Sequence, residues 1–266
     1  MQGKVAFITG VARGQGRAHA VRLARDGVRI FGMDRCADFA TIQYPMATRE
    51  DLEETKKLVE HAGSELVATV GDVRNLADVE ACVATGLEAF GRIDIVLANA
   101  GIMNAGSAWE ITPEQWSEVV DVCLTGAWHT CRAAIPTMIE QGEGGAIVIT
   151  SSVGGLKGLP FAAPYVAAKH GVVGLCRTLA NELGEHNIRV NTVHPNGVNT
   201  PLMTAPDLLS RIAKVPETLG PIFMSSLPGH FVEPEDVSEL VHFLVSDAGR
   251  YMTGGQYRMD LGGLNR

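Results

Sequence analysis

Three side chains near the middle of the chain have types and spacing suited to proton transfer. Tyr165 and Lys169 stand four residues apart, and Ser152 precedes Tyr165 by thirteen residues. On a helix, positions i and i+4 share a face, so the phenol and the ammonium would point into one cleft. We expect the lysine cation to lower the tyrosine pKa from its ordinary value of about 10. The pattern predicts a general acid/base at Tyr165, although such a pair alone is also common on protein surfaces.

A glycine-rich turn near the start of the chain would position a nucleotide beside these groups. Gly10, Gly14 and Gly16 follow the apolar run 5–9 and precede the helix-like segment 17–25. Glycine lets the backbone turn sharply and approach a pyrophosphate, and a helix N-terminus offers free N–H groups. We expect Arg13 and Gln15 of this turn to contact the nucleotide as well. The alternative is that the glycines only make a tight turn.

An acidic residue at the end of the second apolar run would determine the selectivity between NAD and NADP. Asp34 lies eighteen residues beyond Gly16. An acid near that spacing accepts the hydroxyls of the adenosine ribose and repels a 2′-phosphate, which favours NAD over NADP. The simpler alternative is that Asp34 only closes a strand. Arg13 and Arg35 lie close enough in sequence to weaken this preference, and Arg35 is expected to line the same site.

Two later strand ends add groups to the same region. Asp72 would accept a bond from the adenine amino group, with Val73 beside it, although a solvated loop acid is the simpler explanation. Asn99-Ala100-Gly101 ends the fourth apolar run. In open parallel sheets the ligand lies beyond the carboxyl ends of the strands, so these residues should converge with the glycine turn.

The spacing of apolar runs predicts the α/β elements that must position these residues. Strand-length apolar runs fall at 5–9, 28–33, 66–70, 93–98, 146–150 and 188–193, most of them separated by helix-like segments. Continuous apolar strands suit a parallel sheet covered by helices on both faces. Cap-like pairs support the helices: Thr48 with Asp51, Asn75 with Asp78, and Thr112 with Gln115. No linker divides the 266 residues, so we expect a single domain over 1–266.

Composition excludes several other classes of protein. A net charge of −8 disfavours a nucleic-acid partner. The five cysteines are scattered without metal-binding spacing, so we expect reduced thiols and no metal. No run reaches the roughly 18 apolar residues of a membrane-spanning helix, and the first residues do not resemble a secretory signal. We therefore expect a cytoplasmic protein with no membrane partner.

Taken together, the motifs resemble the short-chain dehydrogenase/reductase family over nearly the whole chain. The matching residues are the three glycines of the turn, Asn99-Ala100-Gly101, Ser152, Tyr165, Lys169, His194-Pro195-Asn196-Gly197 and the late Gly254-Gly255 with Asp260. The resemblance implies a Rossmann-type, doubly wound sheet of seven parallel strands, a bound nicotinamide cofactor and usually a homotetramer.

The resemblance also implies a role for each matching residue. Ser152 would hydrogen-bond the substrate oxygen, and Tyr165 would exchange its proton. Lys169 would in addition hold the nicotinamide ribose, while hydride passes between the substrate carbon and the nicotinamide. Val198 and Thr200 are the expected contacts of the cofactor carboxamide.

One position departs from the family pattern. Cys123 stands where the family usually has an asparagine that helps to hold a water in the proton relay to the lysine. A thiol is a weak and short substitute for an amide. We expect either an impaired relay, which Cys123→Asn would improve, or a small buried residue with the relay rebuilt around another water.

Two further stretches narrow the resemblance to one subgroup. Residues 12–20 and the insertion 34–48 look like the actinobacterial mycofactocin-associated subgroup, which includes carveol dehydrogenase-like enzymes. For that subgroup the insertion, about 35–47 here, is expected to fold over the cofactor. NAD(H) would then be held so tightly that an external redox carrier must reoxidise it. The alternative is a surface loop with freely exchanging NAD.

The long segment 195–232 is expected to form an apolar lid over the substrate. Its apolar residues, with Ile102, Met103, Trp109 and Phe161, would line a pocket for a secondary alcohol or ketone of terpenoid or alicyclic type. The alternative is that these residues are ordinary packing or subunit interface. Two rival functions are a ketoacyl-type reductase, which Asp34 disfavours, and a catalytically weak NAD(H)-binding redox sensor, which Cys123 suggests.

Overall fold

A sheet of seven parallel strands forms the centre of the computed structural model, which describes residues 1–229 and 231–265. The strands lie in the order β3-β2-β1-β4-β5-β6-β7, and every pairing is parallel. All six apolar runs form strands as predicted. The bounds are β1 (Val5–Thr9), β2 (Arg29–Asp34), β3 (Leu66–Val70), β4 (Ile95–Ala98), β5 (Gly145–Thr150), β6 (Ile188–Pro195) and β7 (Gln256–Met259).

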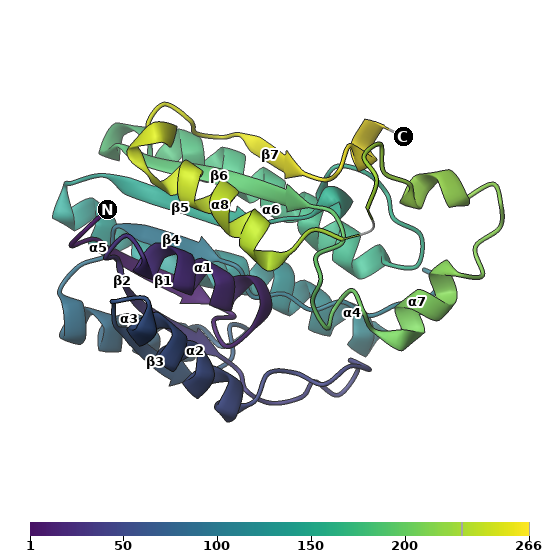
Figure 1. The fold of residues 1–266 in the computed structure, drawn as a ribbon, viewed down its shortest axis with the longest axis horizontal. Helices are drawn as coiled ribbons and strands as arrows, with labels where there is room; N and C mark the ends of the chain where they lie inside the picture. Colours follow the sequence, from purple (N-terminus) through teal and green to yellow (C-terminus); the bar gives the residue numbers. More distant parts are fainter. Residues whose placement is uncertain (230, 266) are drawn as a thin grey trace.

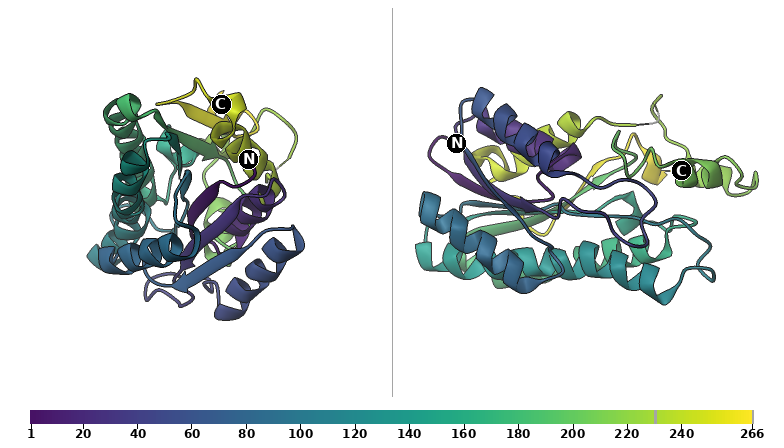
Figure 2. Two further views of the ribbon diagram at one scale, coloured as in Figure 1. Left: turned by 90° about the vertical axis from the view of Figure 1, so that its left-hand side faces the viewer. Right: turned by 90° about the horizontal axis from the view of Figure 1, so that it is seen from below.

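Helices cover both faces of the sheet, as Figure 2 shows. One face packs against α1 (Gly14–Ala24), α2 (Arg49–His61) and α8 (Pro234–Val245). The other face packs against α3 (Leu76–Phe90), α4 (Pro113–Val120), α5 (Gly126–Gln141) and α6 (Ala163–Glu182). This arrangement confirms the predicted doubly wound Rossmann-type fold. The strand order reverses between β1 and β4, which is where such folds bind ligands.

Side-chain caps start three of the helices as the sequence predicts. Thr48 and Thr112 each form a capping box with the third residue of the following helix, and Asn75 accepts a hydrogen bond from the Ala77 N–H. These bonds satisfy backbone N–H groups that have no partner inside the helix. The caps therefore fix the residues at which α2, α3 and α4 begin.

Two irregular segments project from the carboxyl edge of the sheet (Figure 1). The first is the insertion at residues 35–47, and the second is the long segment 195–232, which contains α7 (Pro206–Ile212). Residue 230 of the second segment lies outside the described residues. Both segments are therefore placed where a ligand of this fold class binds.

No helix among the described residues is long and apolar enough to cross a membrane. Within the same ranges, no group of three His, Cys, Asp or Glu side chains is arranged to hold a metal ion.

Candidate active site

The glycine turn leaves no space for side chains at its tightest points. Gly10 has a φ of +71°, and a Cβ there would lie 3.0 Å from the Ala100 Cα. A Cβ on Gly16 would lie 2.0 Å from the Gly10 carbonyl oxygen, so α1 packs directly against the turn. Asn99 fixes the turn from the other strand, because its Nδ2 donates to the Thr9 carbonyl at 3.1 Å. The turn thus presents bare backbone at the start of a helix, which fits a pyrophosphate.

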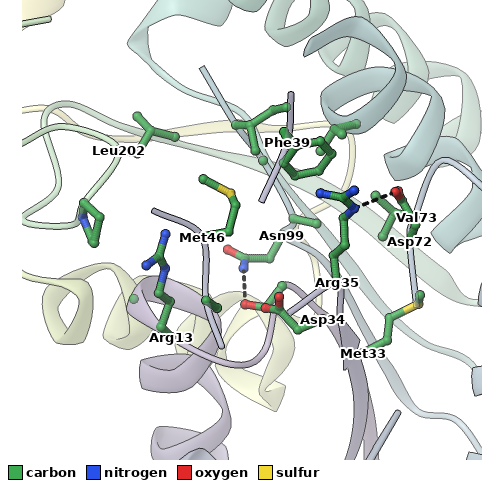
Figure 3. Close-up of a pocket in the computed structure, with 18 of the residues that line it drawn as sticks. Arg13, Met33, Asp34, Arg35, Phe39, Met46, Asp72, Val73, Asn99 and Leu202 are labelled. Atoms are coloured by element: carbon green, nitrogen blue, oxygen red, sulfur yellow. Dashed lines mark hydrogen bonds and ion pairs between the residues drawn. The ribbon is translucent and has the colours of Figure 1, made fainter. Parts of the chain in front are cut away.

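A cavity of about 160 Å³ opens beside this turn (Figure 3). It brings together most of the predicted nucleotide residues: Gly10, Arg13, Gly14, Gln15, Asp34, Arg35, Asp72, Val73, Asn99, Ala100, Gly101 and Thr200 all line it. Gly16 does not line the cavity; it is buried against the Gly10 carbonyl, where it lets α1 pack closely on the turn. The chemistry of this set, with an acid at one end and a helix N-terminus in the middle, fits a dinucleotide.

Asp34 is a largely buried carboxylate at the end of β2. It accepts hydrogen bonds from the backbone N–H groups of Ala12 at 3.1 Å and Cys36 at 3.3 Å. Burial raises its pKa, and these N–H groups and the charge of Arg13 oppose that rise. The carboxylate is therefore rigidly placed on the cavity wall, where it can accept ribose hydroxyls and would repel a phosphate.

Asp72 lies at the cavity as expected, but its carboxylate already has strong partners. Its Oδ2 is 3.1 Å from the Arg35 Nε (Figure 3). The same oxygen is 2.7 Å from an Arg74 terminal nitrogen. Burial raises the pKa of Asp72, but the hydrogen bonds and charges of the two arginines outweigh it and hold the pKa below its usual value. Arg35 is thus ion-paired with Asp72. Its guanidinium carbon also lies over the Phe39 ring, 4.1 Å from the ring centroid. The pairing leaves Arg35 less available to bind a 2′-phosphate, while Arg13 remains on the cavity wall.

The insertion is fastened across this cavity by three contacts. An Arg13 terminal nitrogen donates to the Pro45 carbonyl at 2.7 Å. The Tyr44 hydroxyl accepts from the Met103 N–H at 3.1 Å, and the Thr41 N–H donates to Glu118 at 3.0 Å. The segment is therefore held to the glycine turn, the loop after β4 and α4.

Side chains of the insertion form part of the cavity wall that residue-by-residue reasoning did not identify. Phe39, Tyr44 and Met46 line the cavity together with the predicted residues. The sequence signal was present, since large apolar and aromatic residues in an irregular segment usually pack against something. Which of them would face the cavity depends on contacts distant in sequence.

A larger cavity of about 420 Å³ contains the three residues with which the sequence argument began. Ser152, Tyr165 and Lys169 line it, Ser152 hydrogen-bonds the Tyr165 phenol, and the Lys169 Nζ lies 5.5 Å from the Tyr165 ring centroid. The buried Lys169 Nζ also donates to the Thr150 carbonyl at 2.6 Å. The i, i+4 spacing on α6 does place the phenol and the ammonium in one cavity.

The expected lowering of the tyrosine pKa is wrong. Burial raises the pKa of Tyr165 above its usual value, and Cys123 adds to the rise, while the bond from Ser152 lowers it. The Lys169 ammonium is directed at the Thr150 carbonyl, and burial lowers its own pKa. Desolvation of the phenolate is thus the main influence on the tyrosine pKa.

Ser152 is supported from below by a buried histidine. The His194 Nδ1 lies 2.7 Å from the Ser152 carbonyl oxygen, so this nitrogen must carry the proton and donate. Its Nε2 then accepts from the Thr192 hydroxyl at 2.8 Å. Burial lowers the pKa of His194 to about 4, which keeps the ring neutral at physiological pH.

Cys123 lines neither cavity. It is buried in a π-helical turn, Asp121–Thr125, between α4 and α5. Its thiol donates to the Ile102 carbonyl at 3.2 Å and accepts from the Ile102 N–H at 3.4 Å. The thiol therefore meets both backbone groups of the residue after the Asn99-Ala100-Gly101 motif.

The substrate cavity is covered by much of the predicted lid. The lid residues on its wall are Leu202, Met203, Leu208, Leu209, Ile212, Ile222, Phe223 and Phe231, and Val198 and Thr200 line it as well. Met103 also lines this cavity, whereas Ile102 faces the nucleotide cavity instead. The expected contribution of Trp109 is wrong, because that side chain is 87% exposed, and Phe161 is not part of the wall.

Two adjoining cavities, one suited to a dinucleotide and one apolar with an acid/base group, define an oxidoreductase of the Rossmann class. A family model described as enoyl-(acyl carrier protein) reductase matches residues 10–265. The chain therefore belongs to the short-chain dehydrogenase/reductase family.

Similar proteins narrow this family further. An uncharacterized oxidoreductase of Mycobacterium tuberculosis is 48% identical, with 100% of this chain and 98% of the relative covered. The (-)-trans-carveol dehydrogenase of Rhodococcus erythropolis is 42% identical over 98% of both chains. The crystal structure of carveol dehydrogenase from Mycobacterium avium in complex with NAD superimposes with a TM-score of 0.95 at 42% identity, covering 100% of this chain and 99% of the other.

Proposed function

We propose that this protein transfers a hydride between NAD and a secondary alcohol or ketone of alicyclic or terpenoid type. The observation that carries the proposal is the junction of the two cavities. Gln15, Asn99, Gly101, Thr200 and Leu202 line both of them, so a nucleotide in one cavity would meet a substrate in the other. The similarity to carveol dehydrogenases supports an apolar cyclic substrate.

The residues of the larger cavity would handle the substrate oxygen and its proton. During oxidation, Ser152 would donate a hydrogen bond to the substrate oxygen while the Tyr165 phenolate accepts the hydroxyl proton. Because burial raises the pKa of Tyr165, this phenolate requires stabilisation. Lys169 would supply it as a nearby cation, held in place by the Thr150 carbonyl. A bound nicotinamide would supply the acceptor or donor of the hydride at the substrate carbon.

Asp34 and the glycine turn would hold the nucleotide as NAD. The Gln15 Oε1 supports a ligand at the junction, because it is buried without a hydrogen-bond partner in the described part of the chain. An unpaired buried acceptor is costly, and a carboxamide N–H of the nicotinamide would satisfy it. Val198 and Thr200 stand on the adjoining wall for the same group.

The insertion would keep this nucleotide bound between turnovers. It covers the cavity and is fastened at both Arg13 and Tyr44. We therefore propose that reoxidation of the bound NADH uses an external redox carrier of the mycofactocin type. The expected homotetramer and cytoplasmic location belong to the same proposal, on the basis of the family.

Mass spectrometry of nucleotide released from the purified protein tests this proposal. We expect NAD or NADH to copurify, and carveol or cyclohexanol to be oxidised with an artificial electron acceptor while added NAD alone supports little turnover. Tyr44→Phe removes the hydroxyl that accepts from Met103 and should release the nucleotide several-fold faster. Tyr251→Phe, at an 88% exposed ring, is the matched control. Rapid exchange of wild-type protein with free NAD would contradict nucleotide retention, and no oxidation with either acceptor would contradict the activity.

A further inference from the structure

The wall of the substrate cavity carries a second cation that the proposed chemistry does not use. Among the described residues of that wall, Lys157 and Lys169 are the charged side chains, and no carboxylate is present. Lys169 belongs to the reacting end, where it contacts the Thr150 carbonyl. Lys157 lies in the loop between the turn Val153–Gly155 and α6, beside the lid and the C-terminal turn.

Neutral backbone groups hold the Lys157 ammonium in place. Its Nζ donates to the Ile222 carbonyl at 2.8 Å and to the Gly263 carbonyl at 2.6 Å. A lysine has three N–H donors, so these two bonds leave one donor for another acceptor. The two bonds also join the lid to the C-terminal turn, which fixes the position of the ammonium.

The charge of Lys157 is not neutralised by an ion pair in the described structure. Asp260 is the acid that acts on it through charge, but the Asp260 carboxylate oxygens accept the N–H groups of Gly262 and Leu264 at 3.0 Å each. Burial lowers the pKa of Lys157. With a donor left over and no ion pair among the described residues, the ammonium can bind an acceptor that enters the cavity.

We propose that Lys157 binds an oxygen acceptor on the part of the substrate remote from the reacting carbon. Its charge favours a carboxylate most, then a second carbonyl. This inference rests on the proposed function and sharpens it: the preferred substrates are alicyclic alcohols that carry a second oxygen function. Lys157 is thus a residue that determines specificity, while Ser152 and Tyr165 act on the first oxygen.

A matched pair of ligands tests the proposal independently of turnover. Calorimetry on nucleotide-bound Tyr165→Phe protein, which cannot consume the ligand, compares 4-hydroxycyclohexanecarboxylate with 4-methylcyclohexanol. Adding Lys157→Met removes charge and donors but keeps side-chain length. We expect the Kd for the carboxylate to rise about 10-fold or more and the Kd for the methyl compound to change less than about twofold. Lys157→Arg should restore most of the carboxylate affinity, and Lys56→Met on the exposed face of α2 should change neither.

The outcomes separate this proposal from its alternatives. An equal loss for both ligands would show that Lys157 only fastens the lid, and unchanged binding would show that it faces solvent; either result overturns the proposal. With Tyr165 restored, the same contrast should appear in KM and not in kcat for the two alcohols. If the binding contrast holds but neither alcohol is oxidised with any electron acceptor, the proposed function fails while the Lys157 site stands.

Discussion

The nucleotide cavity is walled by backbone turns and ion pairs, whereas the adjoining substrate cavity is walled largely by apolar side chains from one long segment. In the first, Asp34 is bonded to backbone N–H groups and Asp72 is paired with two arginines. In the second, the charged side chains among the described wall residues are Lys169 at the reacting end and Lys157. Hydrogen bonds and charges impose strict geometry, while apolar walls tolerate changes of shape.

This difference indicates which properties are controlled by the nucleotide cavity with its surroundings, the nucleotide half, and by the substrate cavity with its lid, the lid half. The nucleotide half should be selective for one cofactor and sensitive to single polar substitutions. The lid half should accept a range of cyclic substrates, with its selectivity concentrated at the few polar groups. Substitutions in the two halves should therefore produce different kinds of defect.

The largest effect is expected at the Tyr165 phenol, which transfers the proton of the reaction. Tyr165→Phe removes the proton acceptor but retains the ring, so kcat should fall about 10²- to 10⁴-fold. Nucleotide content should stay unchanged, because the phenol lines the substrate cavity and not the nucleotide cavity. Single-turnover kinetics with bound NAD measures this step. A variant that loses nucleotide instead would break the separation of the two halves.

The cofactor preference should respond strongly to one carboxylate in the nucleotide half. Asp34→Ser removes the charge that repels a 2′-phosphate and leaves Arg13 close by. The ratio of NADP to NAD affinity should rise about 10- to 100-fold, measured by titration after the bound nucleotide is removed. Glu53→Ser, at an exposed position on α2, is a control for a general change of charge. Equal affinities of the wild-type protein for both cofactors would contradict the role of Asp34.

Much of the fold and of the nucleotide site was predictable because their signals are local. The apolar runs are strands because both faces of the sheet are covered, and the glycines are required where a Cβ would strike the backbone. The seventh strand came only from the family resemblance: β7 is four residues long, partly exposed and contains glutamine and arginine, so its pattern is weak.

The remaining features depend on contacts between distant parts of the chain. The pairing of Asp72 with Arg35 and the raised pKa of Tyr165 both follow from burial and orientation, which residue spacing does not reveal. Lys157 stands in a glycine-rich loop, and its bonds to the lid and the C-terminal turn join parts of the chain that are far apart in sequence. Trp109 shows the converse, an apolar residue that faces solvent.

Acid should lower the free energy of unfolding through a buried histidine, His19, on the helix that follows the glycine turn. His19 on α1 bonds Ser238 on α8 at 2.7 Å, and burial lowers its pKa from 6.5 to about 3. The unfolded chain therefore binds a proton below pH 6.5 that the folded protein refuses. The free energy of unfolding should fall by about 1.4 kcal/mol per pH unit from this group, between pH 6.5 and pH 3.

Urea denaturation at pH 7 and pH 5 checks this slope against His19→Asn. The asparagine cannot become charged, so the variant should lose less stability on acidification than the wild-type protein, even if it is less stable at pH 7. Equal slopes for the two proteins would assign the acid sensitivity to other groups. His194, beneath the substrate cavity, should also reduce stability in acid, because its pKa is lowered too.

The smallest effect is expected at Cys123, where the two halves meet beneath Gly101. A Cβ on Gly101 would lie 3.6 Å from the Lys169 Nζ and 3.7 Å from the Cys123 Sγ, so the thiol stands beside the lysine without lining either cavity. Because the thiol already serves both backbone groups of Ile102, Cys123→Asn should change kcat less than about threefold. Cys123→Ala leaves those groups unpaired and should slow turnover more than the asparagine does. A marked increase in kcat for Cys123→Asn across the pH profile would instead show that the thiol limits the proton supply to Lys169.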